Sequence, residues 1–145
     1  MLIRTSCLSD STVVIMSNNV ISDSQFAASV NAGGASRRID NAQEGPKGGF
    51  YVANPKHETP LTSPATAQKV AEHRGQVSQT ASHGYQGGWY DKSDGQGFLD
   101  HSVRVNSPAL AHSLGTIWNQ RAAYNANTGK DLRMSDPSPS AAVKR

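Results

Sequence analysis

The residues that could carry chemistry are five histidines and a group of aspartates around one predicted hairpin. His101 directly follows Asp100, a pair of residue types that a small hydrolase or transferase could use for acid–base catalysis. Consecutive residues of a strand point to opposite faces, so these two cannot form a direct dyad unless a bulge intervenes. Catalysis is therefore the weakest of the three hypotheses about function, after protein binding and nucleotide binding.

Metal and cofactor sites are not indicated by the spacing of the chemistry-bearing residues. No two histidines stand four apart, as a pair on one helix face would, and the single cysteine, Cys7, cannot build a thiolate zinc site. The glycine pairs lack the spacing of a phosphate-binding loop, and the common nucleotide, metalloprotease and esterase motifs are missing from the sequence. We expect no metal, no cofactor and no catalytic residue.

The best functional lead is a set of aromatic residues near a glycine turn. Trp89 and Tyr90 must point to opposite faces of a strand, so at most one joins the core and the other stays partly exposed. Together with Phe98, the exposed ring favours a binding surface or a platform for stacking bases. With Arg104 and Arg121 as phosphate partners, the same surface would bind or sequester a nucleotide, which is the second hypothesis.

Periodicity and turn signals predict the elements that position these residues. Strands are expected over 48–53, 86–91, 97–105 and 121–126, with a short last pairing at Asp131-Leu132, and helices over 63–77 and 108–119. Ser63-Pro64 and Ser107-Pro108 can cap the two helices, Asn54-Pro55 ends the first strand, and Asp94-Gly95 is typical of a hairpin turn. The fold class is α+β, with a small antiparallel or mixed sheet and two helices in β-α-β-β-α-β order, the order of the ferredoxin-like arrangement. The rival arrangement is a small curled antiparallel sheet with one helix packed on it.

Two apolar faces are predicted to form the core. Alternation along the strand 97–105 places Leu99, His101, Val103 and Val105 on one side. In the second helix, the apolar residues fall at helical spacing on one stripe, and we expect this stripe to face the sheet. Its members are Leu110, Ala111, Leu114, Ile117 and Trp118.

The composition places one compact domain at residues 46–133, between flexible arms over 1–45 and 134–145. Hydrophobic residues make up only 36% of the 145 residues, so part of the chain is expected to lie outside a core. Residues 22–30 could form a short helix, but two apolar residues cannot hold a free helix in water. Residues 1–15 are interpreted as an upstream extension, with Met16 as the start.

The charge and hydropathy pattern argues against several partner classes. The 14 basic and 11 acidic residues give a net charge of +3, and the basic residues are scattered, which does not favour nucleic acid. A membrane span needs about 20 consecutive apolar residues, and a signal peptide needs a continuous apolar core. Neither pattern is present in the sequence, so we expect neither membrane insertion nor secretion by a signal peptide.

Several short motifs resemble a small domain of tailed-phage and mobile-element proteins, over roughly residues 48–132. In that pattern a GGW-D turn leads into an LD-S strand, a helix and an NQ-A-YD strand, and this chain departs from it at Asn125, where an acidic residue is expected. The matching segments are Gly48–Val52, Gly87–Asp91, Phe98–Val103, Ala109–Leu114 and Asn119–Tyr124. The resemblance implies a phage origin, in the virion or the host cytoplasm, and no established chemistry.

The leading hypothesis is therefore a non-enzymatic phage-encoded protein. It would be a virion structural component, or an accessory module that binds a host or viral protein. A protein partner or a second copy of the chain would contact the binding surface of Trp89, Tyr90, Phe98, Arg104 and Arg121.

Overall fold

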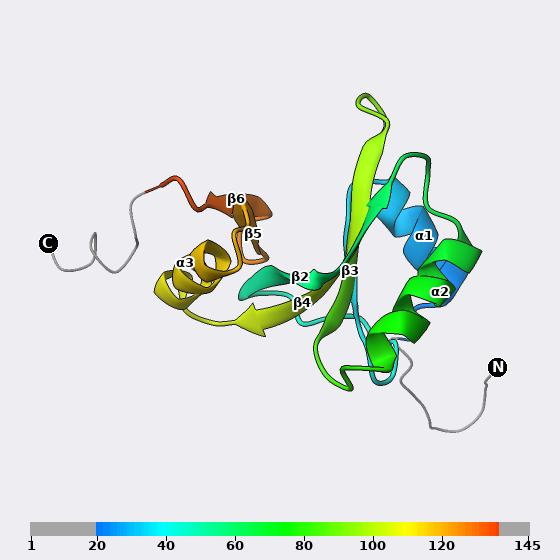
Figure 1. Ribbon diagram of the computed structural model, residues 1–145, viewed down its shortest axis with the longest axis horizontal. Coiled ribbons are helices and arrows are strands. Elements are labelled where there is room, and N and C mark those ends of the chain that lie inside the picture. The colour runs from blue at the N-terminus through cyan, green and yellow to red at the C-terminus, as the bar shows by residue number, and fades with distance from the viewer. Residues whose placement is uncertain (1–19, 137–145) are drawn as a thin grey trace, which may run out of the picture.

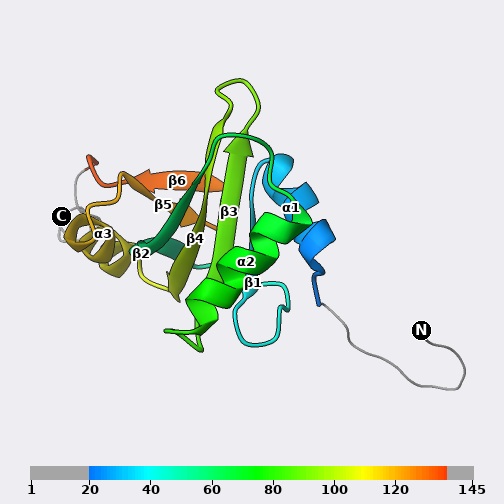
Figure 2. The same ribbon diagram turned by 45° about the vertical axis from the view of Figure 1, so that its right-hand side comes forward.

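A computed structural model describes residues 20–136 and shows an α+β fold. Six strands form one antiparallel sheet in the order β1-β3-β4-β2-β5-β6. The elements are α1 (Asp23–Asn31), β1 (Ala35–Arg38), β2 (Phe50–Leu61), α2 (Ala67–Ser78), β3 (Tyr85–Asp91), β4 (Gln96–Val105), α3 (Pro108–Ile117), β5 (Ala122–Asn125) and β6 (Lys130–Arg133). The sheet is strongly curled, with α1 and α2 together at one end and α3 at the other (Figure 1, Figure 2). The structure thus has three helices where two were expected, and β1 adds a strand at one edge of the sheet. At the other edge, β6 forms the short last pairing expected at Asp131-Leu132.

Side-chain caps determine where the helices begin. Ser107 accepts a hydrogen bond from the Leu110 backbone and Pro108 occupies the first turn of α3, as predicted. In α2 the cap is Thr66, which accepts from the Lys69 backbone. The helix therefore starts later than the predicted Ser63-Pro64 cap, because Thr66 supplies the hydroxyl at the right spacing.

The strand β2 continues past Asn54-Pro55, where the sequence predicted its end. Between Asn54 and Thr59 it advances five residues while β4 advances two, from Leu99 to His101. This bulge takes Pro55 out of the regular ladder, where its missing N–H would cost a hydrogen bond. Pairing then resumes as far as Leu61, whose partner Gly97 lies six residues along β4 from Val103, the partner of Val52, so that Leu61 and Val52 face the same side of the sheet.

Two apolar cores lie under the helices, one at each end of the sheet. The first core joins α1, α2, β2, β3 and β4, and its buried members are Phe26, Ala27, Val30, Leu61, Ala65, Val70, Tyr90 and Leu99. The second core joins α3 to β2 and β5, and its buried members are Phe50, Val52, Ala111 and Ala123. We call these regions the α1–α2 end and the α3 end.

The folded unit is larger than the predicted domain 46–133. Phe26 and Val30 are fully buried in the first core, and β1 pairs along its length with β3. Two apolar residues cannot hold a free helix, but here Phe26 and Val30 are part of the first core, so residues 20–45 belong to the fold and do not form the predicted arm. At the other end Met134 packs on the second core, so the fold also extends past residue 133. The rest of the predicted arms, 1–19 and 137–145, lies outside the described residues.

The predicted core stripe of α3 is only partly correct. Ala111 is fully buried, whereas Leu110 and Ile117 are 53% and 76% exposed. The helix approaches the sheet through its small residues, with Gly115 directly against the Met134 side chain. Leu114 and Trp118, the other members of the predicted stripe, are partly buried against the second core. Within residues 20–136, no helix is long and apolar enough to span a bilayer.

Candidate binding surface

The face of the β3–β4 hairpin that points away from the helices forms the candidate surface. Strand register places Trp89 opposite Phe98, and Gly87 opposite Asp100, on this face. Tyr85 and Ser102 form the next pair on the same face, at the end of the two strands that lies farthest from the hairpin turn. We call Gly87, Trp89, Phe98, Asp100 and Ser102 the hairpin patch.

A loop covers the far part of the same sheet face and so limits the patch. Tyr51 donates its hydroxyl hydrogen to the Pro46 carbonyl at 2.8 Å, and its ring meets Tyr85 edge-on at 5.1 Å between centroids. A side chain at Gly45 would collide with the Tyr51 hydroxyl, so the loop lies close against these rings. The hairpin patch lies beyond this loop, toward the turn of the hairpin.

The aromatic residues divide between the two faces as the alternation predicted. Trp89 is 42% exposed and packs against Phe98, with ring centroids 5.7 Å apart at 56°. Tyr90 lies on the opposite face, buried in the first core. Tyr90 therefore does not contribute to the binding surface for which it was predicted.

The two predicted arginines do not join the aromatic pair. Arg104 stands six residues along β4 from Phe98, about 20 Å away at the rise of a strand. Its Nε donates to the Gly48 carbonyl at 2.8 Å. Arg121 is an exposed residue just before β5, a strand that β2 separates from the two strands of the aromatic pair. The arrangement of rings and guanidinium groups expected for a nucleotide site is thus not assembled.

Asp100 is the charged member of the hairpin patch, and the sequence did not single it out for binding. Its Oδ1 accepts a hydrogen bond from the Ser102 hydroxyl at 2.8 Å, and its carboxyl lies over Gly87, where an added Cβ would come within 2.5 Å of Oδ1. Burial raises the pKa of Asp100 to about 6; the Ser102 bond opposes that rise, and nearby Glu58 adds to it. Alternation along β4 puts Asp100 beside Phe98, but the glycine opposite becomes apparent only with the strand register.

His101 lies on the core face and does not pair with Asp100. Its Nε2 lies 2.8 Å from the His83 carbonyl, which can only accept, so Nε2 carries the hydrogen. The buried Nδ1 has no hydrogen-bond partner among the described residues, and the His57 ring lies 6.2 Å away. The carboxyl of Asp100 is on the other side of the sheet, so the predicted obstacle to a dyad is present.

A buried polar network fills the centre of the α1–α2 end. Arg37, only 1% exposed, donates from Nε to the Gln86 side-chain oxygen at 2.9 Å and from its two terminal nitrogens to Ile21 and Asp23. Gln86 in turn donates to the Val70 carbonyl and to His73, both at 2.9 Å. Composition assigned Arg37 to a flexible arm, and no local pattern in the sequence indicates this network.

The network fixes the protonation of His73 and holds Arg37 away from water. The Nε2 of His73 donates to the His57 carbonyl at 2.8 Å, so its Nδ1 is the acceptor for Gln86. Burial lowers the pKa of His73 and of Arg37, and the bond to Asp23 opposes the shift at Arg37. The Arg37 guanidinium also lies 4.7 Å above the Phe26 ring, which favours a cation at that position.

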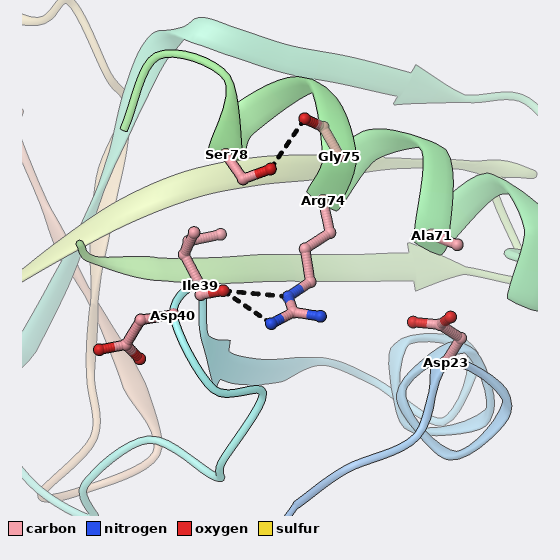
Figure 3. Close-up of a pocket in the computed structure, with 7 residues that line it drawn as sticks. All are labelled: Asp23, Ile39, Asp40, Ala71, Arg74, Gly75 and Ser78. Carbon is pink, nitrogen blue, oxygen red and sulfur yellow. Dashed lines mark hydrogen bonds between the residues drawn. The ribbon is translucent and has the colours of Figure 1, made fainter. Parts of the chain in front are cut away.

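A polar cleft of 360 Å³ opens beside this network, between α1, α2 and the residues after β1 (Figure 3). Arg74 extends across it and donates from Nε and Nη2 to the Ile39 carbonyl, at 3.2 and 2.7 Å. The two aspartates that line the cleft form ion pairs with other arginines, Asp23 with Arg37 and Asp40 with Arg38. The charged groups around the cleft thus already serve internal contacts.

The fold and the hairpin patch define an α+β domain with a helix-covered sheet face and an aromatic, acidic patch on the other. No family model, curated protein or solved structure matches the chain. Among residues 20–136, no three histidine, cysteine or acidic side chains are grouped so as to hold a metal ion.

Proposed function

We propose that the chain is a non-enzymatic, phage-encoded protein that acts by binding another protein, either within the virion or as an accessory module. The hairpin patch is its contact surface. The observation that carries the proposal is the exposed Trp89, which packs against Phe98 on the neighbouring strand of the sheet. Tryptophan is enriched among the residues that dominate binding energy at protein interfaces.

The placement of the titratable side chains supports a binding role over a catalytic one. Asp100 and His101 lie on opposite faces, and His73 is engaged through both ring nitrogens. Such groups hold the fold in place and do not converge on a common point where a substrate atom could react.

Site-specific photo-crosslinking tests the proposal. A photoreactive residue replaces Trp89 in the full chain, produced in the organism that encodes it, and a matched variant carries the same group at Glu72, an exposed position of α2. We expect a protein adduct from position 89 and none from position 72. An adduct that sediments with virus particles identifies a virion component, and a soluble one identifies an accessory role. Equal yields from both positions, or no protein adduct from position 89, would contradict the proposal.

Nucleotide binding is the second candidate, because an exposed Trp89 can also stack on a base. Its test is a fluorescence titration with nucleotides in a Trp118→Phe background, where Trp89 is the only tryptophan. Quenching that saturates at millimolar nucleotide supports this candidate, and an unchanged signal removes it.

We also infer that residues 50–125 form a ferredoxin-like core, with α1, β1 and β6 as additions. The central strands adjoin in the order β3-β4-β2-β5, and the helices α2 and α3 connect strands that are not neighbours. This adjacency supports the split β-α-β arrangement predicted from the element order.

A further inference from the structure

We propose that the hairpin patch recognises a basic side chain, lysine or arginine, on the protein partner. This inference rests on the proposed protein-binding function and adds the chemistry of the group that the patch accepts. It follows from the carboxyl of Asp100 lying on the same face as an exposed indole.

The geometry brings the two halves of a cation site together. Trp89 lies diagonally across the ribbon from Asp100, a separation of about 7–8 Å between Cα atoms that large side chains span. The π-face of an indole attracts a cation, and a carboxylate binds it through a charge-assisted hydrogen bond. A lysine or arginine lying against Trp89 can therefore direct its charged end to Asp100.

The glycine at position 87 keeps the carboxyl of Asp100 close to the strand backbone. A side chain there would occupy the position of the Asp100 carboxyl. Ser102 holds one oxygen of that carboxyl, and its donated hydrogen bond is the only one that the described residues give Asp100. The remaining acceptor sites are available to a donor from outside.

The charges around Asp100 favour a cation from the partner. Glu58, on the β2 bulge, raises the pKa of Asp100, and the neighbouring His101, on the other face, acts in the opposite direction. Among residues 20–136, neither ion pair involves Asp100 or Glu58, since the paired carboxylates are Asp23 and Asp40. A basic side chain supplies the counter-charge that the patch lacks, whereas a phosphate would meet like charge.

NMR titration with short blocked peptides tests this assignment directly. One peptide carries a central arginine, a second has norleucine there, and adenosine monophosphate is the third probe. With the arginine peptide we expect saturable shifts of the Gly87 and Ser102 amides and of the Trp89 indole. Asp100→Asn should weaken that binding about tenfold, since a charge-assisted bond is lost. The matched control Asp94→Asn, in the exposed turn of the same hairpin, should leave it unchanged.

A pH series on the unmodified chain gives a second readout that needs no variant. Arginine-peptide binding should strengthen as pH rises through about 6, because the carboxyl of Asp100 then ionises. Equal shifts from the norleucine peptide, an unchanged affinity in Asp100→Asn, or no shift at the patch would each overturn the assignment. Binding of adenosine monophosphate that becomes tighter in Asp100→Asn would overturn it in favour of a nucleotide. The crosslinking result from position 89 is independent, so a partner that docks through Trp89 without a basic side chain remains distinguishable.

Discussion

The two ends of the sheet are stabilised in different ways. At the α1–α2 end, a core of eight buried apolar residues lies beside the buried network of Arg37, Gln86 and His73. At the α3 end, four buried residues are completed by half-buried neighbours, and Leu110 and Ile117 remain exposed. The α1–α2 end is thus stabilised by directional hydrogen bonds as well as by apolar packing. The α3 end depends more on apolar packing of partly exposed side chains.

This difference implies different tolerance to change. The network ties α1, β1, β3, α2 and the β2 bulge to one another through bonds with defined donors and acceptors. Buried polar groups that lose a partner are costly, so such a region accepts few substitutions. Apolar contacts with half-buried or flexible side chains can readjust, so the α3 end should accept more.

The largest expected effect comes from removing the central amide of the network. Gln86→Leu leaves the Nε of Arg37 and the Nδ1 of His73 without their partner, and it removes the second hydrogen bond of the Val70 carbonyl, which keeps its bond within the helix. Each unpaired buried group costs about 1–3 kcal/mol, so we expect the free energy of unfolding to fall by about 4 kcal/mol in urea denaturation. The matched Gln76→Leu, at an exposed position of α2, should change it by less than about 0.5 kcal/mol. Similar values for the two variants would show that the network contributes little.

Two glycine-to-alanine variants compare packing at the two ends. A Cβ at Gly88 would lie 2.8 Å from Leu99 and 2.9 Å from Val30, both in the first core, so we expect a loss of about 2 kcal/mol from overpacking. A Cβ at Gly115 meets the flexible side chain of Met134, which can move, and alanine favours a helix interior over glycine by about 1 kcal/mol. Thermal unfolding should therefore show a clear loss for Gly88→Ala and almost none for Gly115→Ala. An equal loss at both positions would mean that Met134 is held as rigidly as the first core.

Two groups with pKa values shifted by burial, His73 and Asp100, make opposing contributions to the pH dependence of stability. Burial lowers the pKa of His73 below its ordinary 6.5, so the unfolded state binds this proton more readily and stability falls as pH drops below about 6.5. The pKa of Asp100 is raised to about 6 from 3.8, so its contribution is present at low pH and is lost as pH rises through about 6. Below pH about 6, the loss of stability from His73 and the gain of stability from Asp100 therefore partly cancel as the pH falls.

Asp100→Asn separates the two contributions. Without the carboxyl, the slope from His73 is no longer offset, so the variant should lose stability more steeply than the unmodified chain as pH falls from about 6 to about 4. Each uncompensated proton changes stability by at most about 1.4 kcal/mol per pH unit. Urea denaturation across this range measures the slopes, and parallel curves for the two proteins would contradict the assignment of the opposing term to Asp100.

The sequence predicted what depends on local pattern, and failed where distant segments meet. The Ser107-Pro108 cap and the opposite directions of Trp89 and Tyr90 follow from neighbours in the chain, and the structure has both. Arg37 could not be assigned a role because its partners lie as far as 49 residues away. The place of Asp100 over Gly87 likewise depends on the register of two strands, which alternation alone does not determine.

The smallest expected effect, at Ile117, tests whether the outward residues of α3 contribute to the fold. Ile117 is 76% exposed, so Ile117→Gln removes little buried area and should change the free energy of unfolding by less than about 0.5 kcal/mol. Leu114, on the same helix, packs against the second core, and Leu114→Gln should cost clearly more because it places an amide among apolar groups. Chemical denaturation of both variants decides between the two positions. A loss at Ile117 as large as at Leu114 would mean that Ile117 is covered in solution, so that the α3 end is more closed than its described contacts show.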